Sequence, residues 1–281
     1  MRSRGGLLYD DSPDLEDRGR VELVEGLTEE ETQEALSIIV PLSKGVMIVT
    51  GAPRSGKDLF GNTFAWKMKT YIKDRKVLRD EIPREAFGEY TLFNPSTLGE
   101  ELMEMEELLE EELDKRKLTR KRVSNRVLSH IMSNIADRWL EYKGNDLLRN
   151  TVLYLTEFSG YMYNRAPFNP MNVFLGRILR RWGHYDMLII GTTQVKDELD
   201  KRTCLPYVTH EVRCKWSQTR LNTGLYNIYR TRTITRTGAL EVSHRPIPYF
   251  IDGGKPRERL GNKRYFDIFN SKSGYFANSV R

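Results

Sequence analysis

One short loop limits what this chain can fold into more than any other feature. Residues 44–58 read KGVMIVTGAPRSGKD, an apolar run followed at once by the pattern G-x-x-x-x-G-K. The run predicts a buried strand, and residues 57–76 have the apolar spacing of a helix. A glycine-rich loop between strand and helix turns its N–H groups toward phosphate oxygens, and the lysine reaches the same oxygens. The predicted phosphate-binding residues are Gly51, Ala52, Pro53, Arg54, Ser55, Gly56, Lys57 and Asp58. A glycine-rich turn without a ligand is the alternative.

Asp58 departs from this loop pattern, and a second departure matches it. The residue after the lysine is normally Ser or Thr, whose hydroxyl binds magnesium. A predicted strand at 152–155 runs into Thr156-Glu157, where nucleotide-hydrolysing proteins normally carry Asp-Glu. We interpret the pair as a reciprocal exchange in which Asp58 and Thr156 both serve a magnesium ion, so that oxygen ligands and net charge are retained. Glu157 then keeps the place of the general base.

The order of the predicted elements indicates an α/β fold. Strands and helices alternate along most of the chain, which is typical of a mainly parallel central sheet. After residue 207, alternating segments separated by turn signals predict added antiparallel strands. The predicted strands are 44–51, 89–95, 152–155 and 187–191, and the predicted helices are 27–39, 57–76 and about 170–182.

The chain is expected to form a short arm and one large domain. Its 281 residues are enough for a single core with insertions. Residues 1–25 are polar and predict a flexible N-terminal arm. Residues 26–281 are expected to form the domain, with a helical insertion at 97–145 and a basic, β-rich extension at 207–281.

Charge is segregated within the insertion. Nine acidic and no basic residues lie between Glu100 and Asp114, and seven basic and no acidic residues lie between Lys115 and Arg126. An apolar stripe at helical spacing accompanies them. One interpretation is a hairpin whose acidic and basic arms attract each other or a neighbouring subunit. The other is a long solvated surface helix.

The distribution of charge also bears on partners. Residues 201–281 hold 16 Lys and Arg against 5 Asp and Glu, whereas the formal net charge of the whole chain is +6. Such a basic segment indicates an anionic partner such as nucleic acid, or a solvated basic surface.

Cysteines and apolar runs exclude several protein classes. Two cysteines, Cys204 and Cys214, do not make a disulfide framework and suit a reducing compartment. No apolar run approaches the roughly 18 residues of a membrane helix, and the N-terminus lacks the apolar segment of a signal peptide.

Polar residues follow the strand predicted at 187–191. A side chain at this end of the strand beside the Glu157 strand can sense a terminal phosphate. Gln194 is the first candidate and Thr193 the second. A simple strand-end cap is the alternative.

Four segments taken together resemble a known family. GAPRSGKD, VLYLTEF, RRWGHYDMLIIGTTQVKDELDKR and KRYFDIFNSKSG, in this order, resemble the FtsK–HerA branch of P-loop ATPases. Within it they are similar to zonula occludens toxin-like members and viral genome-packaging ATPases. The resemblance covers roughly 44–76, 89–95 and 150–275. It implies a RecA-like (ASCE) P-loop NTPase fold, ATP and Mg²⁺ as cofactors, and a homo-oligomeric, usually hexameric ring with DNA bound independently of sequence.

The setting and the site residues also follow from the resemblance. Without a membrane helix, the chain is most similar to packaging motors of the host cytoplasm or the virion, with a capsid vertex as a partner and no membrane. Carried over by position, Lys57 binds phosphates, Asp58 and Thr156 serve the metal, Glu157 is the catalytic base and Gln194 the sensor.

The family also supplies an arginine finger from a neighbouring subunit. The candidates are Arg177, Arg180 and Arg181 on the predicted helix and Arg202 after the fourth strand, with Arg202 favoured. For each of them, an arginine on a solvated face is the alternative.

DNA contact is expected from the loop that follows Glu157. Tyr161, Tyr163, Asn164 and Arg165 offer aromatic and cationic groups suited to phosphates and exposed bases. A packed loop over the active site is the alternative.

Four functions remain open on the sequence. The first is an ATP-hydrolysing DNA translocase for viral genome packaging, and the second is a helicase-like or conjugation-type DNA pump. The third is a nucleotide-binding scaffold subunit with a degenerate site, and Asp58 and Thr156 favour it. A small-molecule kinase is the fourth.

Overall fold

The computed structural model describes most of the chain between residues 21 and 264. The described residues are 21–53, 55–80, 96–97, 99–162, 170–216, 223–233, 240–252, 259–260 and 263–264.

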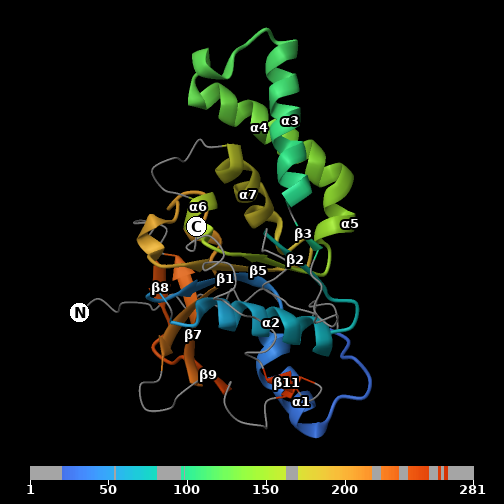
Figure 1. Ribbon diagram of the computed structural model, residues 1–281, viewed down its shortest axis with the longest axis vertical. Helices are drawn as coiled ribbons and strands as arrows, with labels where there is room; N and C mark the ends of the chain where they lie inside the picture. Colours follow the sequence, from blue (N-terminus) through green and yellow to red (C-terminus); the bar gives the residue numbers. More distant parts are fainter. Residues whose placement is uncertain are drawn as a thin grey trace, which may run out of the picture.

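A nine-stranded sheet forms the centre of the described part of the molecule (Figure 1). Its order is β3-β2-β4-β5-β1-β6-β7-β8, with β9 also paired to β7. The six strands from β3 to β6 run parallel, and β7, β8 and β9 add antiparallel pairs. The strands are β1 (Gly45–Thr50), β2 (Lys76–Arg79), β3 (Ser96–Thr97), β4 (Thr151–Leu155), β5 (Leu188–Thr193), β6 (His210–Trp216), β7 (Thr223–Thr233), β8 (Leu240–Val242) and β9 (Ile247–Asp252).

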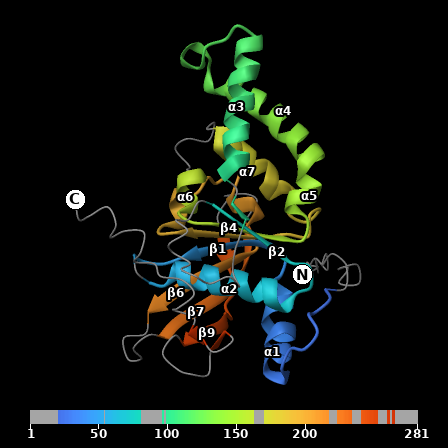
Figure 2. The ribbon, with the colours of Figure 1, turned by 45° about the vertical axis from the view of Figure 1, so that its right-hand side comes forward.

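Helices cover both faces of this sheet (Figures 1 and 2). α2 (Lys57–Tyr71) lies on one face together with α1 (Glu29–Glu34), and α7 (Pro170–Arg181) lies on the other. Alternate residues of β1 pack into the two cores, since Met47 faces the α2 side and Ile48 the α7 side. The apolar run before the loop is therefore buried on both faces, as parallel strands usually are. The predicted α/β fold with a mainly parallel sheet is confirmed.

The second strand is not where the sequence analysis expected it. β1, β4 and β5 confirm three of the four predicted strands within a few residues. The helix predicted at 57–76 ends at Tyr71, and β2 follows it at Lys76–Arg79. The strand predicted at 89–95 lies outside the described residues. β2 escaped notice because it is only four residues long and carries a cation at each end, so that its sequence shows no apolar alternation.

Strands after residue 207 complete the sheet. β6 runs parallel to β1 and antiparallel to β7, and so it joins the parallel core to the antiparallel extension. Of the segment KRYFDIFNSKSG, only Lys263 and Arg264 are described, where they form the two-residue strand β11. β11 pairs with β10 (Arg259–Leu260) apart from the main sheet.

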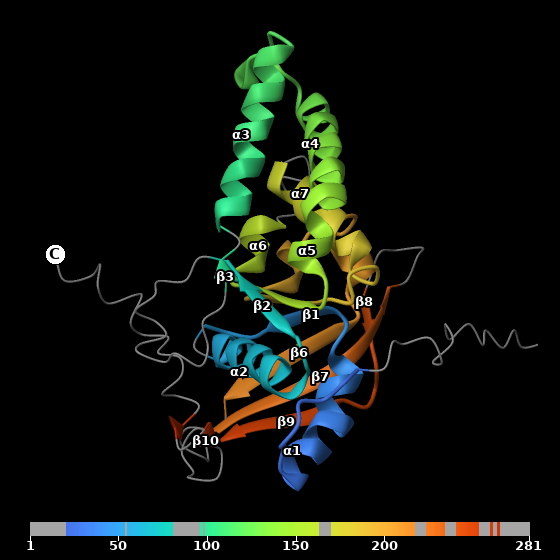
Figure 3. The same ribbon diagram turned by 90° about the vertical axis from the view of Figure 1, so that its right-hand side faces the viewer.

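Two long helices within the predicted insertion pack as a hairpin that projects beyond α7 (Figure 3). α3 (Gly99–Lys115) and α4 (Asn125–Trp139) face each other through buried apolar side chains. Arg120 on the connection binds Glu106 at 2.8 Å and Glu110 at 3.0 Å. The acidic residues of α3 therefore attract the basic segment, but this segment forms the connection of the hairpin and not its second arm.

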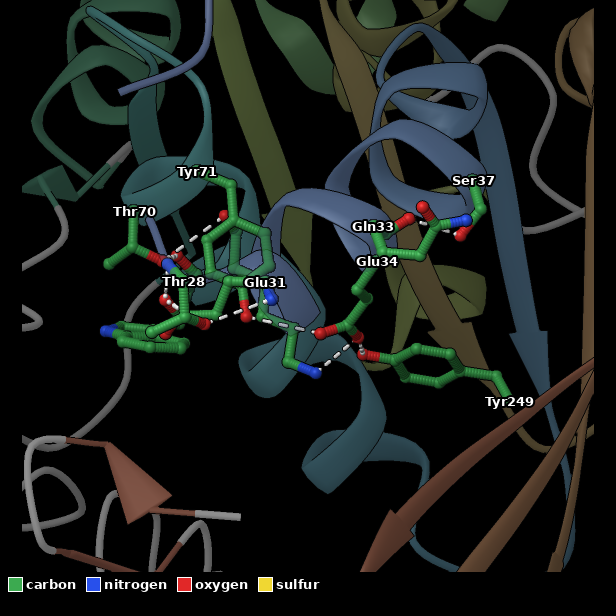
Figure 4. Close-up of polar contacts among 10 residues, drawn as sticks. Thr28, Glu31, Gln33, Glu34, Ser37, Thr70, Tyr71 and Tyr249 are labelled. Atoms are coloured by element: carbon green, nitrogen blue, oxygen red, sulfur yellow. Dashed lines mark hydrogen bonds and ion pairs between the residues drawn. The ribbon is translucent and has the colours of Figure 1, made fainter. Parts of the chain in front are cut away.

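α1 begins at a capping box and is held by a polar cluster (Figure 4). The Thr28 hydroxyl accepts a hydrogen bond from the Glu31 N–H, and the Glu31 carboxylate accepts one from the Thr28 N–H. One helical turn later, Glu34 accepts hydrogen bonds from Tyr71 of α2 and Tyr249 of β9. The cluster ties the first helix to α2 and to the far strand of the sheet.

Candidate nucleotide-binding site

The carboxyl ends of the parallel strands β1, β4 and β5 meet at one edge of the sheet. Thr50 of β1 pairs with Thr193 of β5, and Leu155 of β4 pairs with Gly191 of β5. The loop after β1, the turn after β4 and the segment after β5 therefore leave the sheet side by side. Ligands of open α/β sheets bind at this edge.

The glycine-rich loop leads directly into α2. Gly56 caps the helix with φ 86° and ψ 19°, a left-handed conformation that glycine adopts without steric cost. The Tyr226 hydroxyl of β7 donates to the Gly56 carbonyl at 3.1 Å and holds the loop from the side of the C-terminal strands. Lys57 is buried, and its ammonium donates to the carbonyls of Gly51 at 2.9 Å and Ala52 at 3.1 Å. Arg54 lies outside the described residues.

A buried hydroxyl within the loop has an open hydrogen-bonding position. The Ser55 Oγ is buried and has no hydrogen-bond partner in the described part of the chain. A Cβ at Gly51 would lie 2.3 Å from this oxygen, so only glycine leaves room for it. A buried hydroxyl without a partner costs free energy unless a ligand satisfies it. The loop therefore fits a phosphate group.

Asp58 points toward the ends of β4 and β5. Its Oδ1 lies 3.3 Å from the Tyr154 hydroxyl and 3.5 Å from the Thr192 hydroxyl. Tyr154 is fully buried, and burial together with the charge of Asp58 raises the pKa of its phenol. Tyr154 therefore stays protonated and donates its hydrogen to Asp58.

The position of Tyr154 depends on a glycine in α2. A Cβ at Gly61 would lie 2.6 Å from the Tyr154 ring, so Gly61, a weak point for helix propensity, is what lets the ring lie against α2. The guanidinium carbon of Arg79 stacks 4.3 Å from the centre of the same ring, and Arg79 donates to the Asn62 side chain. These contacts fix the Tyr154 hydroxyl that reaches Asp58.

Thr156 contacts a carboxylate that the sequence analysis missed. Asp80 follows β2, and its Oδ2 accepts hydrogen bonds from the Thr156 N–H at 2.5 Å and from the Thr156 hydroxyl at 2.7 Å. Burial raises the pKa of Asp80 from 3.8 to about 6, although the Thr156 hydroxyl and Arg79 act in the opposite direction. Its Oδ1 is buried and has no hydrogen-bond partner among the described residues. Recognising β2 would have placed Asp80 at this edge of the sheet.

Glu157 has the geometry of an available base. It adopts a left-handed conformation, φ 47°, which costs a non-glycine residue about 1 kcal/mol. Its N–H donates to the Thr192 hydroxyl at 3.2 Å, the same hydroxyl that lies near Asp58. The side chain is exposed, and its carboxylate forms no hydrogen bond or ion pair with another described residue. The turn thus holds the backbone while the carboxylate stays open.

The other predicted residues occupy different surroundings. Gln194 is exposed directly after β5, next to the loop edge, and Thr193 is buried and donates to the Val195 carbonyl. Arg181 and Arg177 contact Asp137 of α4 at 3.1 and 3.4 Å, on the hairpin side.

Arg180 and Arg202 are exposed, and neither side chain has an ion pair within the described ranges. Of the predicted DNA-contacting residues, only Tyr161 is described. Its hydroxyl lies 3.5 Å from Asp80 Oδ2, and thus it faces the same carboxylate as Thr156. Tyr163, Asn164 and Arg165 lie outside the described residues.

The oxygen atoms at this edge suit a hard cation. Asp58, Thr156 and Asp80 offer only oxygen donors, and Asp80 Oδ1 is an unsatisfied one. In the described ranges no three His, Cys, Asp or Glu side chains are grouped so as to hold a metal by themselves. Mg²⁺ is usually bound by one or two carboxylates together with phosphates and water rather than by a protein cage. The residues present therefore fit a magnesium ion shared with a bound nucleotide.

Comparisons with known proteins identify no close relative. No family model and no curated protein matches the chain. Among solved structures, the N-terminal domain of zonular occludens toxin from Neisseria meningitidis is 14% identical, with a TM-score of 0.40, and the match covers 81% of this chain and 100% of that one. The genome-packaging NTPase B204 from Sulfolobus turreted icosahedral virus 2, in complex with ATP-gammaS, is 13% identical, with a TM-score of 0.37 and coverage of 72% and 98%.

A third similar structure is that of the flagellar accessory protein FlaH from Methanocaldococcus jannaschii. It is 12% identical, with a TM-score of 0.37 and coverage of 79% and 99%. Structures of the two kinds that the sequence motifs resemble, an occludens toxin and a packaging ATPase, are thus among the structural neighbours. At these scores the fold assignment rests on the strand order and the loop described above. In the described ranges, no helix combines the length and the apolar character needed to cross a membrane.

Proposed function

We propose that the chain is an ATP-hydrolysing DNA translocase, most specifically a motor that packages a viral genome. The observation that carries the proposal is the convergence of the Lys57 loop, the open carboxylate of Glu157 and the exposed Gln194 at one edge of the sheet. A phosphate-binding loop alone supports nucleotide binding. A loop opposite an unpaired carboxylate supports hydrolysis as well.

Each residue then has a defined task. The loop N–H groups and Lys57 bind the β- and γ-phosphates, after Lys57 exchanges the carbonyls of Gly51 and Ala52 for phosphate oxygens. Glu157 accepts a proton from the attacking water, and Gln194 orients that water near the terminal phosphate. Asp58 and Thr156 would hold the magnesium ion, which when bound neutralises charge on the phosphates.

An arginine from a neighbouring subunit would complete the site. Arg202 suits this role better than Arg181, because Arg202 is exposed, whereas Arg181 is engaged with Asp137 of the same chain. A homo-oligomeric ring, with DNA bound through its phosphates, accounts for the need of such a residue and for the basic C-terminal third.

A nucleotide-binding scaffold is the second candidate. It is favoured by the carboxylate of Asp58 at the position where a hydroxyl is usual, since a negative charge close to phosphates repels them unless a cation intervenes. The two candidates differ in turnover but not in nucleotide binding.

Hydrolysis of ATP tests the proposal directly. The native chain and Glu157→Gln are compared with Mg²⁺, with and without duplex DNA, and binding of a fluorescent ATP analogue is measured for both. We expect DNA-stimulated turnover in the native chain and a loss of at least about a hundredfold in the variant, with nucleotide binding retained. Lys57→Ala is the control that loses binding as well. Nucleotide binding without turnover in the native chain would favour the scaffold.

A further inference from the structure

The hairpin of α3 and α4 is held together by apolar contacts and is joined to α7 by ion pairs. Its two helices share an apolar seam, and the hairpin is fixed at its base because Asp137 of α4 binds Arg177 and Arg181 of α7. Lys143, beyond α4, binds Glu104 of α3 at 2.6 Å. The buried seam residues are Met105, Leu109, Leu113, Leu128, Ile131, Met132 and Ile135. The end of the hairpin projects away from the sheet (Figures 1 and 3).

We name residues 115–126 at this end the hairpin tip. All of its basic side chains are exposed, and it contains no acidic residue. Three of its seven cations are neutralised by α3: Lys115 by Glu111 and Glu112, Arg116 by Glu112, and Arg120 by Glu106 and Glu110.

Four cations are left over. Lys117, Lys121, Arg122 and Arg126 form no ion pair with any other described residue. α4 also begins at the tip, after its N-cap Ser124, and its N-terminus adds partial positive charge. Like charges so close together repel one another, so the tip is suited to an anion that neutralises them.

We propose that the hairpin tip is a second nucleic-acid contact, which binds the phosphate backbone of duplex DNA independently of sequence. Phosphates repeat along DNA, and lysine and arginine side chains on a protruding turn can neutralise several of them at once. Besides its cations, the tip carries only three polar side chains, Thr119, Ser124 and Asn125, and the Ser124 hydroxyl is engaged as the cap of α4. The proposal rests on DNA being the substrate of the proposed function and adds a site distant from the nucleotide edge.

A matched pair of charge variants tests this contact. The tip variant carries Lys117→Gln, Lys121→Gln and Arg122→Gln. The control carries Lys69→Gln, Arg138→Gln and Arg149→Gln, which remove the same charge elsewhere. Binding of a fluorescein-labelled duplex is measured by anisotropy over a range of salt concentrations, and circular dichroism checks that both variants fold.

We expect the tip variant to bind DNA at least about tenfold more weakly and to lower the slope of log K against log salt by about 2 to 3, because each phosphate contact contributes about 0.9. The control should change affinity less than about twofold. Basal ATP turnover without DNA should be equal in all three proteins.

Other outcomes separate this inference from the proposed function. Equal weakening in both variants would show an effect of net charge and overturn the tip contact. Native binding with an unaffected tip variant would also overturn it, while the translocase proposal stands. A native chain that binds no DNA contradicts both. In that case sedimentation of the two variants shows whether the tip contacts an acidic surface of a second copy instead.

Discussion

Two carboxylates in this molecule lie among buried partners, and they are satisfied to different degrees. Glu34 of α1 accepts hydrogen bonds at both oxygens, from Lys67 and Tyr249 at Oε1 and from Tyr71 at Oε2 (Figure 4). Asp80 at the end of β2 accepts all of its hydrogen bonds at Oδ2, and its Oδ1 has none among the described residues.

The difference corresponds to position. Glu34 lies beneath α2, away from the ligand edge, and there a saturated carboxylate joins three elements. Asp80 lies at the carboxyl edge of the sheet, where an unsatisfied oxygen costs about 1 to 3 kcal/mol of stability. In a binding site this cost is offset when the ligand supplies the missing hydrogen-bond partner, whereas in the rest of the fold nothing offsets it. The contrast predicts that Asp80 serves a bound ligand, whereas Glu34 serves the fold.

The largest expected effect is on the free energy of unfolding and concerns the contacts of Glu34. Lys67→Met should lower the free energy of unfolding by about 2 to 3 kcal/mol, because it removes the cation 2.5 Å from Glu34 and leaves that carboxylate without its charge partner. Urea denaturation measures the change. Lys73→Met is the control, since the Lys73–Glu22 pair is exposed and its loss should have no measurable effect. A stability loss of similar size in both variants would mean that burial does not set the value of the Glu34 cluster.

A second effect concerns the pH dependence of stability. Since burial raises the pKa of Asp80 to about 6, the folded chain holds this proton more tightly than the unfolded chain does. The associated stability is fully present below pH 3.8 and is lost as the pH rises through about 6. Asp80→Asn cannot titrate here, so the stability of the native chain relative to this variant should fall by on the order of 2 kcal/mol between pH 4 and 7. Denaturation of both proteins across this range, without nucleotide, measures the difference. If the stabilities of the two proteins changed with pH in the same way, the raised pKa of Asp80 would be contradicted.

The smallest expected effect is on ATP turnover, and it tests whether Asp80 differs from Glu34 in function. At pH 7 Asp80→Asn should retain or slightly raise stability, because its amide oxygen can still accept from Thr156 without a buried charge. ATP turnover should nevertheless fall by about tenfold or more, equivalent to about 1.4 kcal/mol in the barrier. Steady-state kinetics at several Mg²⁺ concentrations measure it. If turnover were unchanged while stability dropped as in Lys67→Met, Asp80 would be structural in the same sense as Glu34.

The sequence predicted the parts of the site whose signals are local. The Lys57 loop, the strands around it and the Thr156-Glu157 turn follow from short patterns and were found within a few residues. Asp80 was missed because β2 has no apolar alternation, and its strand character comes from pairing with β4 far along the chain. The hydroxyl of Tyr154 was missed for a related reason, since only the packing of Gly61 against its ring brings it to Asp58.

The hydrogen bond from Tyr226 to Gly56 has a consequence for biosynthesis. The loop and its clamp are 170 residues apart in sequence, and β6, which joins their strands, is itself made late. A ribosome adds about 5 to 20 residues per second, so Tyr226 is synthesised roughly 10 to 30 seconds after the loop that it contacts. During that interval the emerging polypeptide carries an unsupported phosphate loop. A nascent chain therefore completes this contact on the loop only after β7 has left the exit tunnel.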